Sequence, residues 1–377
     1  MSRSLMASMR RARRLMRPRR PTRAAKSVGK AMTGLMFASA IAPLKALKPK
    51  KARRRKPPAS RTGRSLGPVV RQLQAAQALV TRTPPRPEVT PRIPAGAQYL
   101  SRTHRSAAGS RGYKLYLPAG TKHPRGLIVM LHGCSQTPDD FAVGTRMNAV
   151  AQKHGLAVAW PAQLGAHNAA SCWNWFRPVH QARGRGEPAI LASLTRKLVK
   201  ELGLGRDATF VAGLSAGGAM AAILADTYPD LYAAAGIHSG LARGSARDVI
   251  SAMQTMRNGG SPAGRTPAIA ARALAVRRIV IQGASDSTVH PSNAGAIVAA
   301  ALAEGAEPVK VGSRSAGGRG YSRSDYAGAD GSVLVEFWMI DGAGHAWSGG
   351  RPAGSFADRK GPDASAQMMR FFLTKTT

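Results

Sequence analysis

The segment 208–225 constrains the possible folds more than any other part of this sequence. An apolar run over 208–214 predicts a buried strand, and the small apolar residues over 216–225 predict a helix that follows at once. The junction between them is a Gly-Leu-Ser-Ala-Gly run at 213–217. A turn this tight strains its central residue and places glycines where the chain passes close to itself. The pattern predicts that Ser215 projects above a sheet as a nucleophile; the alternative is an ordinary turn serine that caps a helix.

Short β-like runs alternate with helical patterns from about residue 100 onward. Strands are predicted at 112–117, 126–131, 156–160, 208–214, 231–237, 277–282 and 333–340, and helices at 189–202, 216–225 and 293–304. Continuous apolar strands such as 126–131 fit a sheet that is buried on both faces. The alternation predicts an α/β fold in which a mostly parallel sheet carries helices on both faces.

A nucleophilic serine needs a base, and the base needs an acid that orients it. Asp286 is the first acid after the predicted strand 277–282, and His345 lies in a loop of small residues after the last predicted strand. In proteins with this kind of serine turn, the acid and the histidine follow the serine in that order. We therefore predict Asp286 and His345 as its partners, with His290 as the alternative base and Asp341 as the alternative acid. The structural alternative for His345 is a hydrogen-bonded loop histidine.

The negative oxygen of an acyl-transfer intermediate needs two backbone N–H donors. One is predicted at Ala216, the residue after the serine. The other is predicted at Cys134, in the loop 131–136 that follows the strand 126–131. We call residues 131–136 the oxyanion loop. The alternative for this loop is a plain turn in which Gly133 supplies a positive φ.

Five motifs follow one another within residues 110–375. They read LHGCSQ at 131–136, CWNWF at 172–176, GLSAGG at 213–218, DSTVHPSN at 286–293 and GHAWSGG at 344–350. Together they resemble the polyhydroxybutyrate depolymerase family of esterases, in which related esterases act on feruloyl or acetyl esters of plant polysaccharide. The resemblance implies an α/β-hydrolase fold with nucleophile Ser215, acid Asp286 and base His345. It also implies an oxyanion contribution from the Cys134 loop.

The predicted substrate-binding residues are Gln136, Trp173 and Trp347, which all lie in these motifs. The two tryptophans, together with Trp175, are expected to form an apolar wall for an aliphatic acyl group. The alternative for Trp173 and Trp175 is packing under their loop as core.

The chain has two cysteines, Cys134 and Cys172, which excludes a disulfide-rich scaffold and a four-cysteine zinc site. Either they form a disulfide that braces the oxyanion loop in an oxidising compartment, or they are small buried thiols. No two histidines share a ligand-like spacing with a carboxylate, and a serine mechanism needs no metal, so neither a metal nor a cofactor is expected. No run of 18 apolar residues occurs, which excludes an ordinary membrane-spanning helix.

The charge divides the chain into two parts. Lysines and arginines number 56 against 18 acids, and residues 1–100 hold 25 of these basic residues and one acid, Glu88. We predict a basic, largely disordered leader over 1–100, with one short helix at 69–80, and an esterase domain over 101–377.

The alternatives for the leader are an anchor for an anionic surface or hydrophobic particle and an export signal built on the apolar stretch 31–42. Nucleic-acid binding by the leader would be electrostatic, so no specific nucleic-acid partner is expected.

These expectations combine into a serine esterase acting on short-chain 3-hydroxyalkanoate esters, as polyhydroxybutyrate-type polymer or oligomers, through an acyl-enzyme. The alternative enzyme is a carboxylesterase on feruloyl, acetyl or other small esters. The alternative of another class is a non-catalytic basic protein that binds a surface or nucleic acid. The resemblance implies secretion, with an intracellular place at polymer granules as the alternative. We expect no separate polymer-binding domain after the catalytic part, which would favour amorphous or granule-bound polymer, oligomers or small esters over crystalline polymer.

Overall fold

The computed structural model describes residues 89–260, 275–302, 307–328 and 331–374. The chain divides into two units, Met1–Gly67 and Pro68–Thr377. The predicted apolar stretch 31–42 and helix 69–80 lie outside the described residues, and the division at residue 100 stays a prediction. Within the described ranges, no helix has the length and apolar character needed to cross a membrane.

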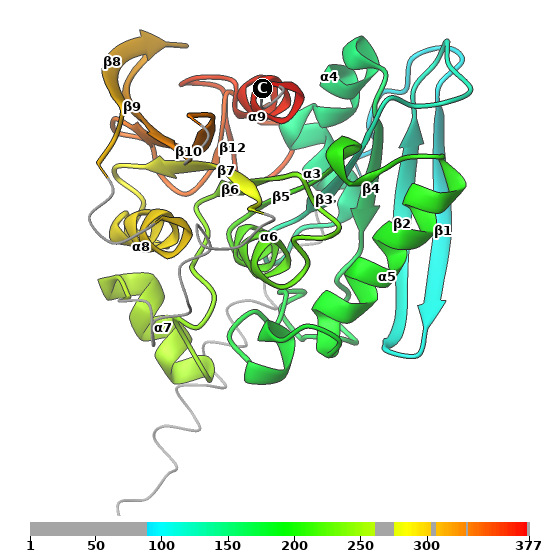
Figure 1. Ribbon diagram of the computed structural model, residues 1–377, viewed down its shortest axis with the longest axis horizontal. Helices are drawn as coiled ribbons and strands as arrows, with labels where there is room; N and C mark the ends of the chain where they lie inside the picture. The colour runs from blue at the N-terminus through cyan, green and yellow to red at the C-terminus, as the bar shows by residue number, and fades with distance from the viewer. Residues whose placement is uncertain (1–88, 261–274, 303–306, 329–330, 375–377) are drawn as a thin grey trace, which may run out of the picture. The chain divides into compact units, whose positions relative to one another are not determined.

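One ten-stranded sheet forms the centre of the described domain, in the order β1-β2-β4-β3-β5-β6-β7-β10-β9-β8 (Figure 1). The strands are β1 Gln98–Ser106, β2 Gly109–Leu117, β3 Leu127–Leu131, β4 Ala157–Pro161, β5 Thr209–Leu214, β6 Ala234–His238, β7 Arg277–Gly283, β8 Lys310–Ala316, β9 Arg319–Ala327 and β10 Val333–Ile340. The strands from β4 to β10 in this order pair in parallel. Antiparallel strands extend the sheet at both edges. The predicted mostly parallel sheet is confirmed.

Three strands of the antiparallel parts of the sheet, β1, β8 and β9, were not predicted from the sequence. Their residues are largely polar: β8 reads KVGSRSA and β9 reads RGYSRSDYA. Strands of this kind lack the continuous apolar run of a strand that is buried on both faces, so their pattern resembles that of a loop. The predicted strand 231–237 begins only at Ala234, because Leu231 and Tyr232 form the turn that follows Tyr228.

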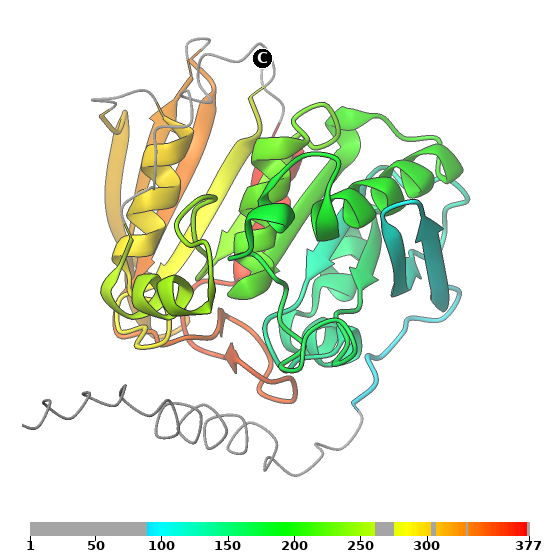
Figure 2. The same ribbon diagram turned by 90° about the horizontal axis from the view of Figure 1, so that it is seen from below.

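Helices cover both faces of the sheet (Figures 1 and 2). One hydrophobic core holds side chains of α5 Gly186–Glu201, α6 Ala216–Thr227, α7 Val249–Asn258 and α8 Ser292–Ala301, and the other holds those of α3 Pro138–Thr145, α4 Met147–His154 and α9 Ala364–Leu373. Strand β3 contributes side chains to both cores: Val129 and Leu131 belong to the first, and Ile128 and Met130 to the second. The predicted helices on both faces are confirmed. Short 3₁₀ helices at Pro178–Gln181 and Arg206–Ala208 and a small parallel pair, β11 Trp347–Ser348 with β12 Ala357–Asp358, complete the described elements.

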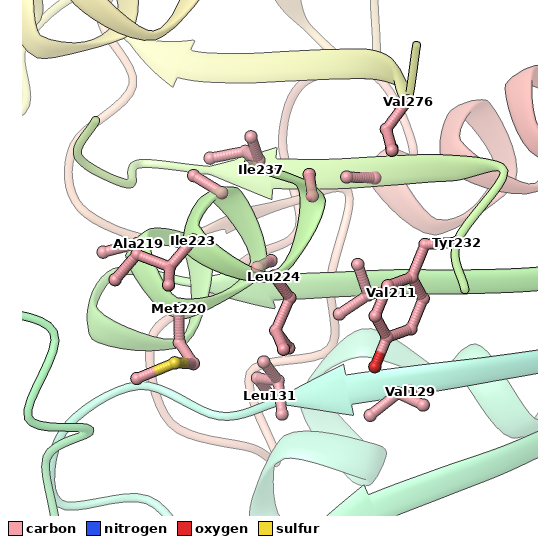
Figure 3. Close-up of a cluster of buried hydrophobic side chains, with 14 of the residues drawn as sticks. Val129, Leu131, Val211, Ala219, Met220, Ile223, Leu224, Tyr232, Ile237 and Val276 are labelled. Atoms are coloured by element: carbon pink, nitrogen blue, oxygen red, sulfur yellow. The ribbon is translucent and has the colours of Figure 1, made fainter. Parts of the chain in front are cut away.

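Helix α6 lies in the middle of the first core (Figure 3). All of its residues from Ala216 to Thr227 are buried, so the helix has no face exposed to solvent. Figure 3 shows Leu224 of α6 beside Leu131 and Val211 of the sheet. Full burial of each such aliphatic side chain contributes about 1.5–3 kcal/mol relative to exposure. This packing fixes the start of α6, and with it the residue that precedes the helix.

Candidate active site

Ser215 is the single residue between β5 and α6. Its backbone angles, φ 57° and ψ −120°, are strained for a residue with a side chain. A Cβ on Gly217 would lie 2.6 Å from the His132 carbonyl oxygen and closer still to that of Leu131, so glycine is needed where α6 starts against the end of β3. The Ser215 N–H donates to the His238 carbonyl oxygen at 2.9 Å, which fixes the turn to β6. The predicted strand, serine turn and helix are present.

Asp286 and His345 meet beyond the carboxyl ends of β7 and β10. The His345 Nδ1 lies 2.8 Å from the Asp286 Oδ2, so the carboxylate orients the imidazole ring. The two loops approach closely because residue 283 is glycine: a Cβ there would lie 2.7 Å from the Gly344 carbonyl oxygen. The structure therefore brings together the acid and the histidine predicted from separate strand ends.

Several donors hold the Asp286 carboxylate in its charged form. Burial raises its pKa, but the hydrogen bond and charge of His345 and the backbone N–H groups of Thr288 (2.9 Å) and Val289 (2.8 Å) outweigh burial, so the pKa lies below its usual value. Gln282, a buried polar residue inside the apolar strand β7, donates its Nε2 to Asp286 Oδ2 at 3.1 Å. A charged carboxylate at Nδ1 leaves the imidazole Nε2 as the atom that accepts a proton.

The alternative base and acid are not part of this pair. His290 is exposed, and its Nδ1 lies 2.9 Å from the Ser292 hydroxyl at the start of α8. Asp341 is exposed directly after β10, and its backbone N–H donates to the Gly320 carbonyl oxygen at 2.9 Å. The observed acid–histidine pair is thus Asp286 with His345.

His238, at the end of β6, is a buried residue of the site that no sequence pattern marked. Its Nε2 accepts the Ser348 N–H at 3.1 Å, and its ring stacks on Trp347 with 5.2 Å between centroids. Burial, followed by the charge of His345, lowers the pKa of His238 to about 3, so the ring stays neutral. Because the His238 carbonyl also holds Ser215, this residue joins the serine turn to the loop that carries His345.

The loop after β3 lies against the serine turn. A Cβ on Gly133 would lie 3.6 Å from the Ser215 Cβ and 3.1 Å from the Gln136 Oε1. Gly133 is not among the described glycines with positive φ; the loop residue in that region is Ser135, at 60°. The alternative explanation of Gly133 as the positive-φ residue of a plain turn is therefore wrong. Glycine fits there because the loop comes close to the Gln136 amide and to Ser215.

Gln136 braces this loop, which corrects its prediction as a substrate-binding residue. Only 2% of Gln136 is exposed. Its Oε1 accepts the Gly133 N–H at 2.9 Å, and its Nε2 donates to the Ser355 carbonyl oxygen at 3.0 Å and to Asp140 Oδ2 at 3.2 Å. Both ends of the amide are bonded to the protein, so Gln136 positions the loop and does not face a substrate.

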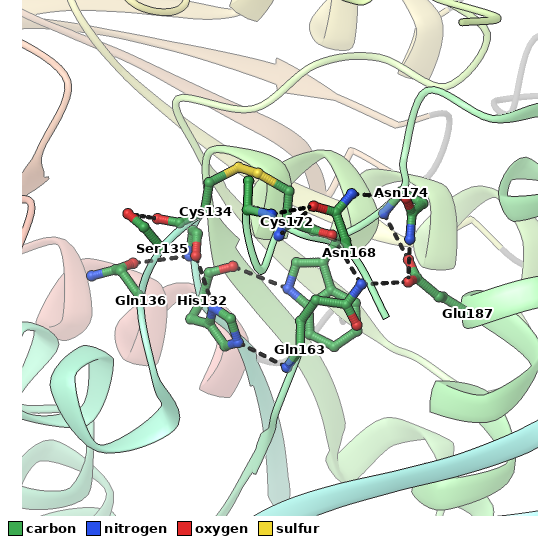
Figure 4. The surroundings of a disulfide bond; sticks show 12 residues. His132, Cys134, Ser135, Gln136, Gln163, Asn168, Cys172, Asn174 and Glu187 are labelled. Carbon is green, nitrogen blue, oxygen red and sulfur yellow. Dashed lines mark hydrogen bonds between the residues drawn. A yellow bond between two sulfur atoms is a disulfide. The ribbon is translucent and has the colours of Figure 1, made fainter. Parts of the chain in front are cut away.

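Cys134 and Cys172 form a disulfide, which decides between the two alternatives for the cysteines (Figure 4). Hydrogen bonds reinforce this link, since the Ser135 N–H donates to the Ala170 carbonyl oxygen at 2.9 Å. The backbone N–H of Cys134, the predicted oxyanion donor, thus belongs to a loop that is attached covalently to a second segment. The Ala216 N–H, the other predicted donor, lies at the start of α6.

A buried carboxylate, Glu187, anchors the segments around this disulfide (Figure 4). It accepts hydrogen bonds from Gln163 Nε2 at 2.6 Å and from the backbone and side-chain nitrogens of Asn174, both at 2.8 Å. The Gln163 N–H in turn donates to His132 Nε2 at 3.0 Å, which connects the network to the oxyanion loop. Arg111 Nη2, 3.8 Å from the carboxylate, supplies the opposite charge. No local sequence pattern predicted this network.

Trp173 and Trp347 are core residues, which corrects the prediction that they line a substrate. Their exposed fractions are 0% and 1%. Trp173 Nε1 donates to the His132 carbonyl oxygen at 3.0 Å, and Trp347 packs edge-on against Phe141 with 5.4 Å between centroids. Trp175 is buried as well, so the alternative of packing under the loop holds for both residues of that motif.

Ser215, Asp286 and His345 follow the carboxyl ends of β5, β7 and β10, which is the usual edge for a site in an open α/β sheet. The arrangement offers a strained serine, an oriented imidazole and backbone N–H donors. In the part of the chain that the structure describes, no group of three or more histidine, cysteine, aspartate or glutamate side chains is arranged to hold a metal ion.

Comparison with known proteins finds likenesses to a family model and to individual enzymes. A family model described as esterase PHB depolymerase matches residues 111–320. The chain is 29% identical over 241 residues to poly(3-hydroxyalkanoate) depolymerase C of Paucimonas lemoignei, covering 61% of this chain and 57% of that protein. It is 28% identical over 128 residues to feruloyl esterase B of Neurospora crassa, covering 34% and 43%. The chain therefore spans about half the length of these relatives.

A solved structure shares the fold. The acetyl xylan esterase from Aspergillus awamori superimposes with a TM-score of 0.55 at 20% identity, covering 66% of this chain and 93% of that one. This likeness, with the sheet order and the serine turn, shows that the described domain has an α/β-hydrolase fold.

Proposed function

Because this chain belongs to the esterase PHB depolymerase family, we propose that it is a serine esterase that hydrolyses short-chain 3-hydroxyalkanoate esters, as polymer or as oligomers. The observation that carries the proposal is the pairing of His345 with Asp286 at the sheet edge where Ser215 stands on its strained turn. Nucleophile, base and orienting acid are the three groups of serine hydrolysis.

In the first half of the proposed reaction, the Ser215 Oγ attacks the ester carbonyl carbon while His345 Nε2 takes the hydroxyl proton. The Asp286 carboxylate stabilises the imidazolium that forms. The carbonyl oxygen becomes negative and accepts hydrogen bonds from the backbone N–H groups of Ala216 and Cys134. The bond to the alcohol oxygen then breaks, and His345 gives its proton to the departing alkoxide.

In the second half, water hydrolyses the acyl-enzyme. His345 Nε2 takes a proton from the water, whose oxygen attacks the acyl carbon at the same oxyanion position. Collapse of the intermediate releases the carboxylic acid, and the proton returns from His345 to the Ser215 Oγ. The disulfide and Gln136 support this cycle by holding the Cys134 loop against Ser215 in both halves.

We infer the preferred acyl group from the share of this chain that each match covers. The match to the Paucimonas depolymerase covers 61% of this chain, whereas the match to the feruloyl esterase covers 34%. The wider match favours 3-hydroxyalkanoate esters. A carboxylesterase acting on feruloyl or acetyl esters is the second proposal, because relatives and a structural neighbour carry those names.

A panel of esters tests the proposal with the full chain. We expect kcat/KM for the 3-hydroxybutyrate trimer to exceed that for methyl ferulate and for methyl acetate, and we expect Ser215→Ala to lose several orders of magnitude on all three. A preference for methyl ferulate or for the acetate would favour the second proposal. Turnover that survives in Ser215→Ala would contradict both.

We also propose that the domain works in an oxidising compartment, after export. The support is the disulfide, since such bonds persist outside the reducing cytosol. Alkylation of the protein from its native host, followed by mass spectrometry, tests this. We expect Cys134 and Cys172 to be protected until reduction and the N-terminus to start near residues 39–43. Free thiols together with an intact leader would overturn it.

A further inference from the structure

Phe356 lies beside His345 with its ring open to solvent. Its ring centroid is 6.3 Å from that of the His345 imidazole, in an edge-to-face arrangement, and 45% of the residue is exposed. It is the one aromatic residue among the exposed large hydrophobic residues of the described ranges. An apolar ring next to a catalytic histidine, reachable from solvent, is suited to contact a bound molecule.

The backbone at Phe356 is strained, and its surroundings maintain that strain. Its φ is 49°, in the left-handed region that bulky residues seldom adopt. The Phe356 carbonyl oxygen accepts the Trp347 N–H at 2.7 Å, and the next residue, Ala357, pairs with Trp347 in the small sheet. Strained residues that persist in this way concentrate at functional sites.

Hydrogen bonds hold Ser355, the residue before Phe356, against the oxyanion loop. The Ser355 N–H donates to Asp140 Oδ1 at 2.8 Å, and the Ser355 hydroxyl donates to the other oxygen of the same carboxylate. Gln136 Nε2 donates to the Ser355 carbonyl oxygen at 3.0 Å, while its Oε1 holds Gly133. One glutamine amide therefore sets the distance between the oxyanion loop and the segment that carries the Phe356 ring.

We propose that Phe356 contacts the alcohol portion of the ester and makes the enzyme prefer alcohols with an apolar group. The inference rests on the proposed function, in which His345 hands its proton to the departing alkoxide. The group beside the imidazole is then adjacent to the alcohol, while the acyl portion stays with Ser215. In a 3-hydroxyalkanoate chain, the alcohol portion is the next monomer unit with its alkyl side group.

Steady-state kinetics with four simple esters tests this assignment. Methyl and benzyl butyrate differ in the alcohol, and methyl butyrate and methyl hexanoate differ in the acyl chain; methyl acetate completes the set. For Phe356→Ala we expect kcat/KM for benzyl butyrate to fall about tenfold, the size of one aromatic contact, with methyl butyrate within about twofold of the wild type. Phe356→Leu, which keeps an apolar side chain, should recover part of the loss.

Two further variants separate contact with substrate from support of the fold. Glycine tolerates a positive φ, so Phe356→Gly should unfold at the same temperature as Phe356→Ala or higher, yet show the same loss on benzyl butyrate. Leu373→Ala, an exposed position at the end of α9, is the control and should change none of the ratios.

Three results would overturn the proposal. Losses that follow acyl length rather than the alcohol would assign the ring to the acyl side. Equal losses on all four esters would make Phe356 a structural residue. If the wild type turned over none of the esters, the proposed function would fail, and this inference would fail with it.

Discussion

The serine turn and the oxyanion loop meet at one site but are held in place by different kinds of contact. The serine turn is fixed by backbone atoms that come close because residues 213 and 217 are glycines. The oxyanion loop is fixed by side-chain contacts with distant parts of the chain: the disulfide to Cys172, the bond of the Gln136 amide to Ser355, and the network of the Glu187 carboxylate. A group at the site can thus be positioned in two ways. Glycines can let backbone segments approach closely, or bonds between many side chains can hold the segments together. The two modes should respond differently to mutation.

The largest combined loss of stability and activity is expected at the serine turn. Gly217→Ala places a Cβ within 2.6 Å of the His132 carbonyl oxygen, and backbone on both sides prevents relaxation. We expect about 3 kcal/mol or more of lost stability and a fall of kcat/KM by at least about 100-fold, as for a misplaced reacting group. Urea unfolding and ester hydrolysis measure the two effects.

Gly295→Ala is the matched control for that variant. Gly295 is exposed in α8, and a Cβ there would meet no atom within 4 Å. Alanine in a helix is favoured over glycine by about 1 kcal/mol, so this variant should be stabilised and fully active. Equal behaviour of the two variants would contradict the role of close backbone approach.

The next effect is expected from the carboxylate that anchors the loop network. Glu187→Gln replaces an acceptor of three hydrogen bonds and leaves the buried Arg111 without its counter-charge. Breaking a buried pair of this kind costs about 3–5 kcal/mol, measurable by urea unfolding. The exposed pair of Glu201 with Arg102 provides the control, since Glu201→Gln should cost at most about 1 kcal/mol. A similar loss in both would show that burial of Glu187 is unimportant.

Loss of the disulfide should follow in size. Replacing both Cys134 and Cys172 by alanine keeps the backbone N–H at 134 but frees the loop that the bond closes over 38 positions. We expect a loss of about 3 kcal/mol and a lower kcat with an intact serine turn. Reductant should reproduce the loss in the wild type and have no effect on the variant. A wild type that tolerates full reduction unchanged would contradict the bracing role.

The smallest effect is expected at His238, which joins the serine turn to the loop that carries His345. His238 has a pKa of about 3 in the folded chain, against about 6.5 when unfolded. The unfolded chain therefore binds the proton first as pH falls, and folded stability declines below about pH 6.5. Between pH 7 and pH 5 this amounts to about 2 kcal/mol. His238→Gln should flatten that pH dependence; an unchanged slope in the variant would rule out His238 as its source.

The difference between local backbone contacts and long-range side-chain contacts also explains which parts of the site could be predicted from the sequence. Ser215, Asp286 and His345 were found because each follows an apolar strand, and a strand with its turn is a local pattern. The polar strands β1, β8 and β9 carry no such pattern. Gln136 and Trp347 were expected to touch substrate, because proximity to a motif shows that a residue is near the site but not which way its side chain points.

The remaining parts of the site depend on contacts between distant segments. Glu187 meets Gln163 and Asn174, and Gln136 meets Ser355 across 219 positions of sequence. Phe356 follows Ser355 in the chain, so the contact of Gln136 with Ser355 helps to hold its ring beside His345. No local spacing encodes them, so only the folded chain reveals them.

Covalent labelling of the nucleophile tests the central claim most directly. Diethyl 4-nitrophenyl phosphate transfers a diethylphosphoryl group to an activated serine and releases 4-nitrophenolate, whatever ester the enzyme prefers. We predict one adduct per chain, located at Ser215 by peptide mass spectrometry, with slower labelling in His345→Ala and none at this position in Ser215→Ala. Labelling at another serine, or no labelling of the folded wild type, would contradict the assignment of Ser215, Asp286 and His345 as the catalytic groups.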